Sequence, residues 1–245
     1  MNHSVVSEAE WLAARRRHLL REKDLLRQLD DLRRQRRELP WMAVARSYSF
    51  FGPRGSQTLA DLFDGRSQLV VQHFMFAPDW EEGCVGCSFQ ADHVDAAFVH
   101  LQHHDVAFAA VARAPWPKLD AFRRRMGWKF HWVSSYGSDF NRDFGVSFPP
   151  QALANGPVFY NFEMQNLASE EMPGVSVFFR DVDGAIYRTY SAYGRGVEQI
   201  VGAYSYLDLT PKGRNETGPA FDLTDWVRLH DRYETGTAHS CCARR

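Results

Sequence analysis

Short apolar runs alternate with segments of helical periodicity through the middle of the chain. Residues 68–76 and 106–113 are apolar runs of strand length, and residues 129–134 indicate another short strand. Between them, residues 88–101 and 117–127 repeat apolar side chains at the spacing of a buried helix face. Strands that alternate with helices are typical of parallel β-α-β crossovers. The pattern therefore predicts an α/β fold, with helices flanking a sheet.

A long, charged helix is predicted ahead of this region. Ser7-Glu8-Ala9-Glu10 has the spacing of a capping box, and Leu39-Pro40 ends the helix because a residue before proline disfavours the helical region. A sparse apolar stripe runs along it at Leu12, Leu19, Leu26 and Leu29. So narrow a stripe on so long a helix indicates packing across the domain or against a second subunit. We therefore expect that this helix can form a homodimer.

The second half of the chain predicts further strands. Residues 158–164 indicate one strand, and residues 175–180 and 185–190 flank Asp183-Gly184, which is a hairpin signal. An antiparallel hairpin beside parallel strands makes the expected sheet mixed. Residues 196–206 indicate a terminal helix, whose inner face would carry Val197, Ile200, Val201 and Tyr204.

Composition and charge indicate how the chain is divided and which classes of function are excluded. The patterns divide the chain into a helical N-terminal extension (1–40), an α/β domain (41–233) and a disordered tail (234–245). The chain has 245 residues, 44% of them hydrophobic, which is enough for one substantial core. The formal net charge is −1, and acidic residues interleave with the arginines of the long helix. These features argue against nucleic-acid binding.

The sequence was compared with the patterns of export signals and membrane spans. Its N-terminus lacks the basic, apolar and small-residue regions of a signal peptide. No apolar run approaches the roughly 20 residues that span a bilayer. Four cysteines in a chain of this length do not make a disulfide scaffold. We therefore expect a cytoplasmic protein that does not bind membranes.

The clearest chemistry lies in Cys84-Val85-Gly86-Cys87, between the strand at 68–76 and the helix that follows. Unpaired N–H groups at a helix N-terminus favour a thiolate, and such cysteines have pKa values of roughly 3.5–7.5, against about 8.5 for a free thiol. C-x-x-C beside a strand–helix unit is typical of a thioredoxin-like redox site. Cys84 would attack, and Cys87 would resolve the mixed disulfide. The expected substrate is a small-molecule or protein disulfide, and no cofactor is needed.

The same cysteines also fit a metal site. Thiolate and imidazole ligands suit copper or zinc, and His73 lies on the strand that leads into the motif. Cys84, Cys87 and His73 would then serve copper handling or the oxidation of a small aromatic substrate. Inert structural thiols are a third alternative. Cys241 and Cys242, adjacent at the C-terminus, are either a mobile thiol relay or part of a disordered end.

Longer segments resemble proteins of the thioredoxin fold. Residues 119–130, followed by Phe144-Gly145-Val146 and by residues 174–181, resemble peroxiredoxins and bacterial thiol–disulfide oxidoreductases. Nearly the whole chain is similar to a bacterial thioredoxin-like family catalogued as domain of unknown function 899. The recurring motifs of that family stand here at residues 73–76, 83–87, 137–144, 193–196, 207–214 and 230–233. The resemblance implies a thioredoxin-like fold of the peroxiredoxin type, and either thiol–disulfide exchange or a peroxidase-like reaction.

The chain departs from both better-known families at the motif. Val85-Gly86 stands where thioredoxins have Gly-Pro, and the Thr or Ser that precedes a peroxiredoxin cysteine is absent between Pro78 and Cys84. Ser176 falls near the place of the cis-proline that faces the dithiol in thioredoxins, so that a polar slot for a ligand is expected there.

Two further residues complete the expected substrate site. Trp80 would wall the substrate groove, with a place in the core as its alternative role. Arg195 would add positive charge near the thiolate, with a surface ion pair as its alternative role. The candidates for substrate binding are therefore Trp80, Ser176 and Arg195.

Overall fold

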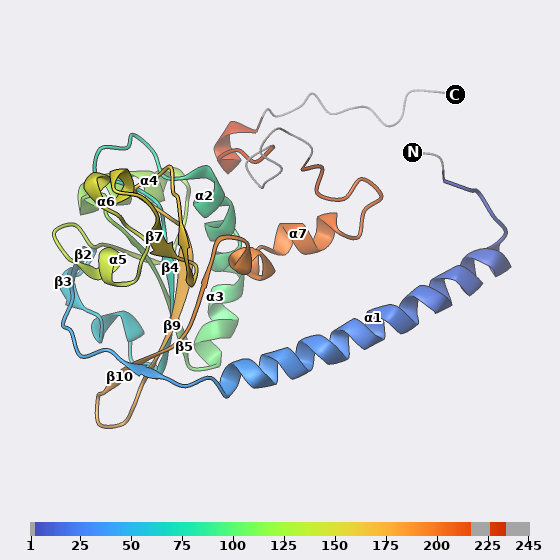
Figure 1. The fold of residues 1–245 in the computed structure, drawn as a ribbon, viewed down its shortest axis with the longest axis horizontal. Helices are drawn as coiled ribbons and strands as arrows, with labels where there is room; N and C mark the ends of the chain where they lie inside the picture. Colours follow the sequence, from blue (N-terminus) through green and yellow to red (C-terminus); the bar gives the residue numbers. More distant parts are fainter. Residues whose placement is uncertain (1–2, 217–225, 234–245) are drawn as a thin grey trace. The chain divides into compact units, whose positions relative to one another are not determined.

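The computed structural model describes residues 3–216 and 226–233 and divides the chain into two compact units, Met1–Trp41 and Met42–Arg245 (Figure 1). The first unit contains α1 (Glu8–Arg37), which confirms the predicted long helix. Its capping box is complete. The Ser7 hydroxyl accepts the N–H of Glu10 at 3.4 Å, and the Glu10 carboxylate accepts the N–H of Ser7 at 3.0 Å. These bonds occupy N–H groups that have no partner within the helix.

The second unit is built on a mixed sheet. Within the described residues this sheet has eight strands, in the order β1-β10-β9-β4-β5-β6-β2-β3. β4, β5 and β6 run parallel to one another, and the other neighbours are antiparallel. The predicted α/β fold is therefore confirmed. The strands are β1 (Met42–Ala43), β2 (Ser49–Gly52), β3 (Gly55–Thr58), β4 (Gln68–His73), β5 (Val106–Ala112), β6 (His131–Ser134), β9 (Gly174–Arg180) and β10 (Ile186–Tyr193).

Both faces of the central strands are covered. Alternate residues of β5 from Ala107 to Val111 pack with η1 (Asp61–Phe63) and α5 (Phe140–Asp143). The residues between them, from Phe108 to Ala112, pack with α3 (Val94–His103) and α4 (Trp116–Arg125) on the other face. Strands buried on both faces need no polar alternation, so they read as continuous apolar runs in the sequence.

One predicted helix is interrupted. The prediction of a single helix over residues 88–101 was wrong, because α2 (Val85–Ala91) ends before α3 begins. His93 lies in the break. Its Nδ1 donates to the carbonyl oxygen of Phe89 at 2.8 Å, and its Nε2 accepts the N–H of Ala203 at 3.0 Å. The second bond comes from a distant segment, which helical periodicity cannot reveal.

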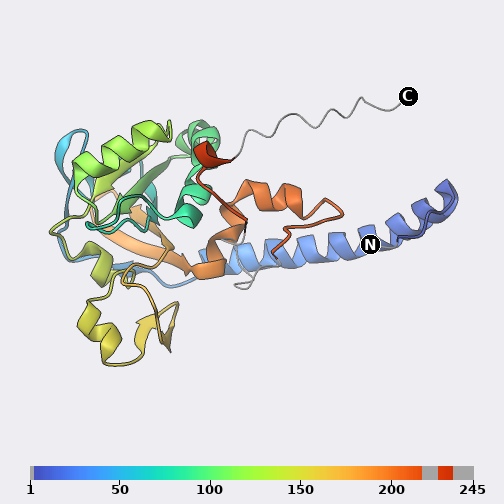
Figure 2. The ribbon, with the colours of Figure 1, turned by 90° about the horizontal axis from the view of Figure 1, so that it is seen from above.

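The single strand predicted over residues 158–164 is also wrong. It is a hairpin of β7 (Val158–Tyr160) and β8 (Glu163–Gln165), separate from the main sheet. Asn161 and Phe162 turn the chain with φ values of 52° and 67°. The left-handed region usually takes glycine, so this turn had no sequence signal. Figure 2 shows the hairpin and α6 (Pro150–Ala154) projecting from one side of the sheet.

The C-terminal prediction holds only in part. β9 and β10 form the expected hairpin, with Gly184 in its turn at a φ of 89°. The helix predicted over residues 196–206 is instead η2 (Gly194–Ile200) and α7 (Gly202–Leu207), separated at Val201, which is extended. η3 (His230–Arg232) follows after residues that are not described. None of the described helices is both long and apolar enough to cross a membrane.

Candidate active site

The C-x-x-C motif lies at the carboxyl ends of β4 and β5. Beyond the end of β4, Phe74 donates its N–H to the carbonyl oxygen of Val111 at 2.8 Å, so pairing with β5 continues. The chain then loops out and returns, and Cys84 donates its N–H to the carbonyl oxygen of Met75 at 3.0 Å. Cys84 is the N-cap residue of α2. The predicted strand-to-helix junction therefore exists at the expected rim of the sheet.

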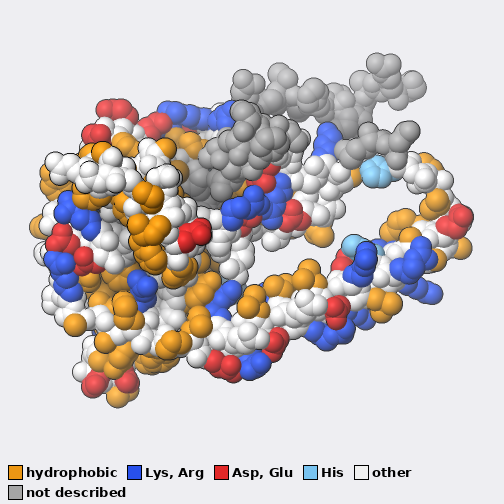
Figure 3. Space-filling view, in the orientation of Figure 1, with side chains coloured by type: hydrophobic (Ala, Val, Ile, Leu, Met, Phe, Trp, Pro, Cys, Tyr) orange, Lys and Arg blue, Asp and Glu red, His pale blue; other side chains and the backbone are white. Residues whose placement is uncertain are grey.

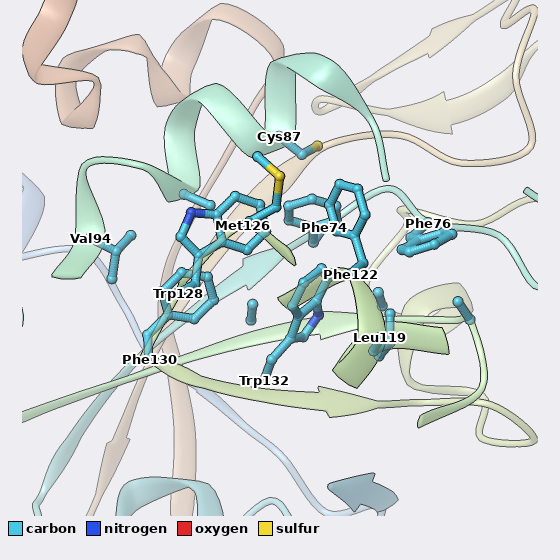
Figure 4. Packing of buried hydrophobic residues seen from close by; sticks show 14 of the residues in the cluster. Phe74, Phe76, Cys87, Val94, Leu119, Phe122, Met126, Trp128, Phe130 and Trp132 are labelled. Atoms are coloured by element: carbon cyan, nitrogen blue, oxygen red, sulfur yellow. The ribbon is translucent and has the colours of Figure 1, made fainter. Parts of the chain in front are cut away.

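The loop before the C-x-x-C motif is held in place by contacts with buried aromatic rings and with Lys118. A Cβ atom on Gly83 would lie 2.7 Å from Cε1 of Phe74 and 3.0 Å from Cε1 of Phe122, so a side chain does not fit there. Figure 4 shows both rings beneath the helix that carries Cys87. The Lys118 ammonium donates to the carbonyl oxygens of Pro78 at 2.9 Å and Trp80 at 2.8 Å. These contacts pre-organise the turn before Cys84.

Cys84 is a partly exposed free thiol whose anion is stabilised. A hydrogen bond from the Cys87 thiol lowers the pKa of Cys84 most; burial opposes this, and the N–H groups of Cys87 and Gly86 lower the pKa further, to about 7. Two of the three donors are backbone groups at the start of α2, where N–H groups have no intrahelical partner. A substantial fraction of Cys84 is therefore thiolate near neutral pH.

Cys87 has the opposite character. It is 3% exposed, and its sulfur accepts the N–H of Met75 at 3.4 Å. The hydrogen bond to Cys84, burial and the neighbouring thiolate charge raise the pKa of Cys87 well above its ordinary value. Gln72 Nε2 donates to the carbonyl oxygen of Cys87 at 2.9 Å and holds this turn of α2 to β4. One thiol is thus acidic and belongs to a partly exposed residue, and the other is protonated and buried.

A buried polar cluster that sequence reasoning missed acts on Cys87 through its charge. Glu171 is 1% exposed, accepts the Ser147 hydroxyl at 2.7 Å and pairs with Arg113. Burial raises the pKa of Glu171, and the charge of Glu171 in turn raises the pKa of Cys87. Arg113 directly follows β5 and could have been found, because polar residues at the ends of parallel strands share one rim. Glu171 lies in a segment without periodicity and left no signal.

His73 and Ser176 lie together inside the domain. His73 Nε2 is 2.8 Å from the Ser176 hydroxyl, which lies 3.0 Å from the Ser191 hydroxyl. The imidazole packs against the rings of Phe140 and Phe144. Burial lowers the pKa of His73 to about 3. Ser176 is fully buried, so it is bonded within the core rather than lining an open slot.

The alternative metal ligands do not converge. Residues alternate between the two faces of a strand, so His73 points to the face of the sheet opposite Phe74, which packs in the cluster of Cys87. Among the described residues, no three His, Cys, Asp or Glu side chains form a group that could hold a metal ion. The structure therefore does not bring His73 to Cys84 and Cys87 as a third ligand.

Arg195 takes its alternative place on the surface, and Trp80 lies only partly in the core. Trp80 is partly buried and packs against the aromatic cluster under α2. Arg195 is exposed and pairs with Glu198 at 2.9 Å, which is a surface ion pair. Cys241 and Cys242 lie outside the described residues.

A parallel β-α-β-α-β core, extended by an antiparallel hairpin beside its first strand, with C-x-x-C at the start of the first crossover helix, defines a thioredoxin-like fold. The chain belongs to a family described as "Bacterial protein of unknown function (DUF899)", whose model matches residues 1–233. No curated protein matches the sequence.

Three solved structures with a similar fold are named as redox proteins, and each has low sequence identity to this chain. BcpB, a peroxidoxin of Mycobacterium tuberculosis, is 12% identical over 66% of this chain and 93% of its own, with a TM-score of 0.45. A putative thiol:disulfide interchange protein DsbE of Chlorobium tepidum is 16% identical over 67% and 97%, with a TM-score of 0.42. PrxQ of Xylella fastidiosa, as a C47S mutant, is 12% identical over 65% and 88%, with a TM-score of 0.41. Identities this low say nothing of the substrate.

Iodoacetamide should alkylate Cys84 with an apparent pKa near 7, while Cys87 stays unlabelled in the folded protein. Relative to a thiol of pKa 9, the thiolate fraction at pH 7 rises about 50-fold, but weaker basicity lowers nucleophilicity, leaving roughly a sixfold advantage in rate. Peptide mass spectrometry over a pH series measures the rate at each cysteine. Cys87→Ala removes the thiol that donates a hydrogen bond to the Cys84 thiolate, so the pH dependence of Cys84 alkylation should move to higher pH. An unchanged pH dependence would show that this hydrogen bond does not lower the pKa of Cys84.

Proposed function

We propose that this protein is a thiol–disulfide oxidoreductase that uses Cys84 and Cys87 on a disulfide substrate. The observation that carries the proposal is the inequality of the two thiols. Cys84 is partly exposed and ionises near neutral pH, whereas Cys87 is buried and holds its proton. An attacking thiol is most effective when its pKa lies near the ambient pH, and a resolving thiol must stay unreactive until the mixed disulfide has formed.

The reaction follows from this asymmetry. The Cys84 thiolate attacks one sulfur of the substrate disulfide, whose S–S bond breaks and releases the first substrate thiol. Cys84 is then uncharged, which removes the nearby negative charge that helped to keep Cys87 protonated. The first released substrate sulfur, which leaves as a thiolate, takes the Cys87 proton. Cys87 then attacks the Cys84 sulfur, and the second substrate sulfur leaves as a thiolate that takes a proton from water. Two electrons pass from the dithiol to the substrate, which ends as two thiols, and Cys84 and Cys87 end as a disulfide.

Thiol titration of the native protein, combined with elemental analysis, tests the proposal. Oxidation should remove two thiols reversibly, and peptide mapping should place the bond between Cys84 and Cys87. A stoichiometric transition metal that blocks both thiols would instead favour copper or zinc binding. Consumption of a hydroperoxide by the same protein separates the peroxidase-like reaction from disulfide exchange, because a peroxide first gives a sulfenic acid on Cys84.

A further inference from the structure

A cavity of about 320 Å³ opens at the amino ends of β5 and β6, and all the residues that line it belong to the second unit. β5 pairs with β4 from Val106 onward, but its register with β6 begins only at Ala109, which lies opposite His131. The described sheet therefore has a gap beside Ala107 and Phe108, and both of these residues line the cavity. A cavity of this volume can hold a small organic ligand.

Basic side chains outnumber acidic ones in the wall of this cavity. Four are basic and two are acidic, which leaves an excess of two positive charges in a chain whose net charge is −1. By contrast, basic and acidic side chains lie interspersed over the face of the protein shown in Figure 3. An excess of one sign around a partly enclosed space attracts ligands of the opposite sign, here anions. The six charged residues are Arg54, Arg66, Arg123, Lys129, Asp61 and Asp64.

The two acidic side chains of the wall are already occupied. Asp64 accepts Nη1 of Arg54 at 2.9 Å and Nη1 of Arg66 at 3.1 Å, so two guanidinium groups share one carboxylate. Asp61 instead accepts the N–H and the hydroxyl of Thr58, at 2.7 and 2.8 Å. An anion in the cavity can therefore bind the remaining N–H groups of Arg54 and Arg66.

The positive charges of the wall act on a common point, the imidazole of His131. Burial lowers the pKa of His131 most, and the charge of Arg54 lowers it further. Asp64 opposes this shift, and Arg123 adds to it. Arg54 lies in the turn between β2 and β3, whereas Arg123 lies on α4. Two distant parts of the chain thus direct positive charge to the same place, where it would attract an anion.

Aromatic rings form another part of the wall. Phe98 of α3 and Trp116 at the start of α4 are partly buried and pack against the core cluster on that face of the sheet. Phe130 and Trp132, which also line the cavity, are buried rings of this cluster in Figure 4. Flat apolar surface beside cationic groups fits a ligand that joins a ring to a negative charge.

We propose that this cavity binds a small aromatic carboxylate. The guanidinium groups of Arg54, Arg66 and Arg123 hold the carboxylate, because their planar N–H donors match its two oxygens. The ring packs against Phe98 and Trp116. Among the described residues that line the cavity there is neither cysteine of the C-x-x-C motif, so this site is separate from the dithiol and does not depend on the proposed redox activity.

Three probes test the chemistry of the ligand. Benzoate has both ring and carboxylate, whereas acetate lacks the ring and benzyl alcohol lacks the charge. Each is titrated into the ¹⁵N-labelled full-length protein, and the indole N–H signals are followed by NMR. Benzoate should bind with a Kd of about 1 mM or tighter, and each of the other two at least about tenfold more weakly. Absence of benzoate binding, or equal affinity for all three probes, would overturn the proposal.

Arg123→Gln and Arg124→Gln are a matched pair of variants that locate the site. Both arginines lie on α4 and pair with Asp120, at 2.8 and 2.6 Å, but only Arg123 lines the cavity. Arg123→Gln should weaken benzoate binding by at least about tenfold, and Arg124→Gln by less than about twofold. Arg66→Gln, in a different segment, should weaken binding as Arg123→Gln does, so the result does not rest on one variant. Circular dichroism and the rate of Cys84 alkylation check that each variant is folded. Equal benzoate affinity in all three variants would show that the cavity is not the binding site.

Discussion

Cys84→Ser should lower the turnover of a disulfide substrate by roughly 1000-fold or more, to the uncatalysed background. A serine hydroxyl does not ionise near neutral pH and cannot form a disulfide with the substrate. The measurement is the rate of reduction of a small disulfide with dithiothreitol as electron donor. Cys241 and Cys242 should both be serine in every variant, so that these two thiols cannot contribute to the rate. Undiminished turnover in Cys84→Ser would refute its role as nucleophile.

Cys87→Ser separates the two chemical steps. Serine at this position can still donate a hydrogen bond to Cys84, so attack on the substrate should persist, but nothing resolves the product. One equivalent of mixed disulfide on Cys84 should accumulate, which intact-mass measurement detects. Multiple turnover at the unmodified rate in this variant would mean that Cys87 has no part in the reaction.

The parts of the fold that the sequence predicted are those set by local burial. β4 and β5 are buried on both faces, so each reads as a largely apolar run of strand length, and β6 reads as a short strand after them. Once three parallel strands are assigned, their carboxyl ends must share a rim, and this places Cys84 at the start of a crossover helix without any coordinates. The position of the dithiol was therefore predictable from periodicity and topology together.

The errors arose where distant segments meet. The break at His93 depends on a bond from Ala203, and the buried charge that acts on Cys87 is that of Glu171. Neither residue shares a periodic element with its partner, so a single sequence has no local signal for the contact. Ser176 was chosen by analogy with thioredoxins and Arg195 for its charge, and their contacts here are with His73 and Glu198. The position of the Cys84 thiol could thus be predicted from the sequence, but the residues that surround it could be identified only from the structure.

His73 should make the folded state lose stability steeply in mild acid. Burial, together with the charge of Arg188, holds the pKa of His73 at about 3, against 6.5 for an ordinary histidine. Nδ1 has no hydrogen-bond partner within the described residues, so a proton there would be buried without an acceptor. Above pH 6.5 the imidazole is neutral in both states and pH has no effect through it. Between pH 6.5 and 3 only the unfolded chain takes up the proton, so stability falls as the pH is lowered.

The expected slope is about 1.4 kcal/mol per pH unit, which gives roughly 2.7 kcal/mol lost at pH 4.5. Since domains of this size are stable by about 5–15 kcal/mol, one histidine can account for a large part of acid unfolding. His73→Gln keeps a polar group for Ser176 but does not titrate. Urea unfolding at a series of pH values should therefore show the unmodified protein losing its advantage over His73→Gln by this amount between pH 7 and 4.5. If the difference in unfolding free energy between the unmodified protein and His73→Gln is instead constant with pH, the protons taken up on acid unfolding bind to other groups. His73 is then not the residue that makes stability depend on pH.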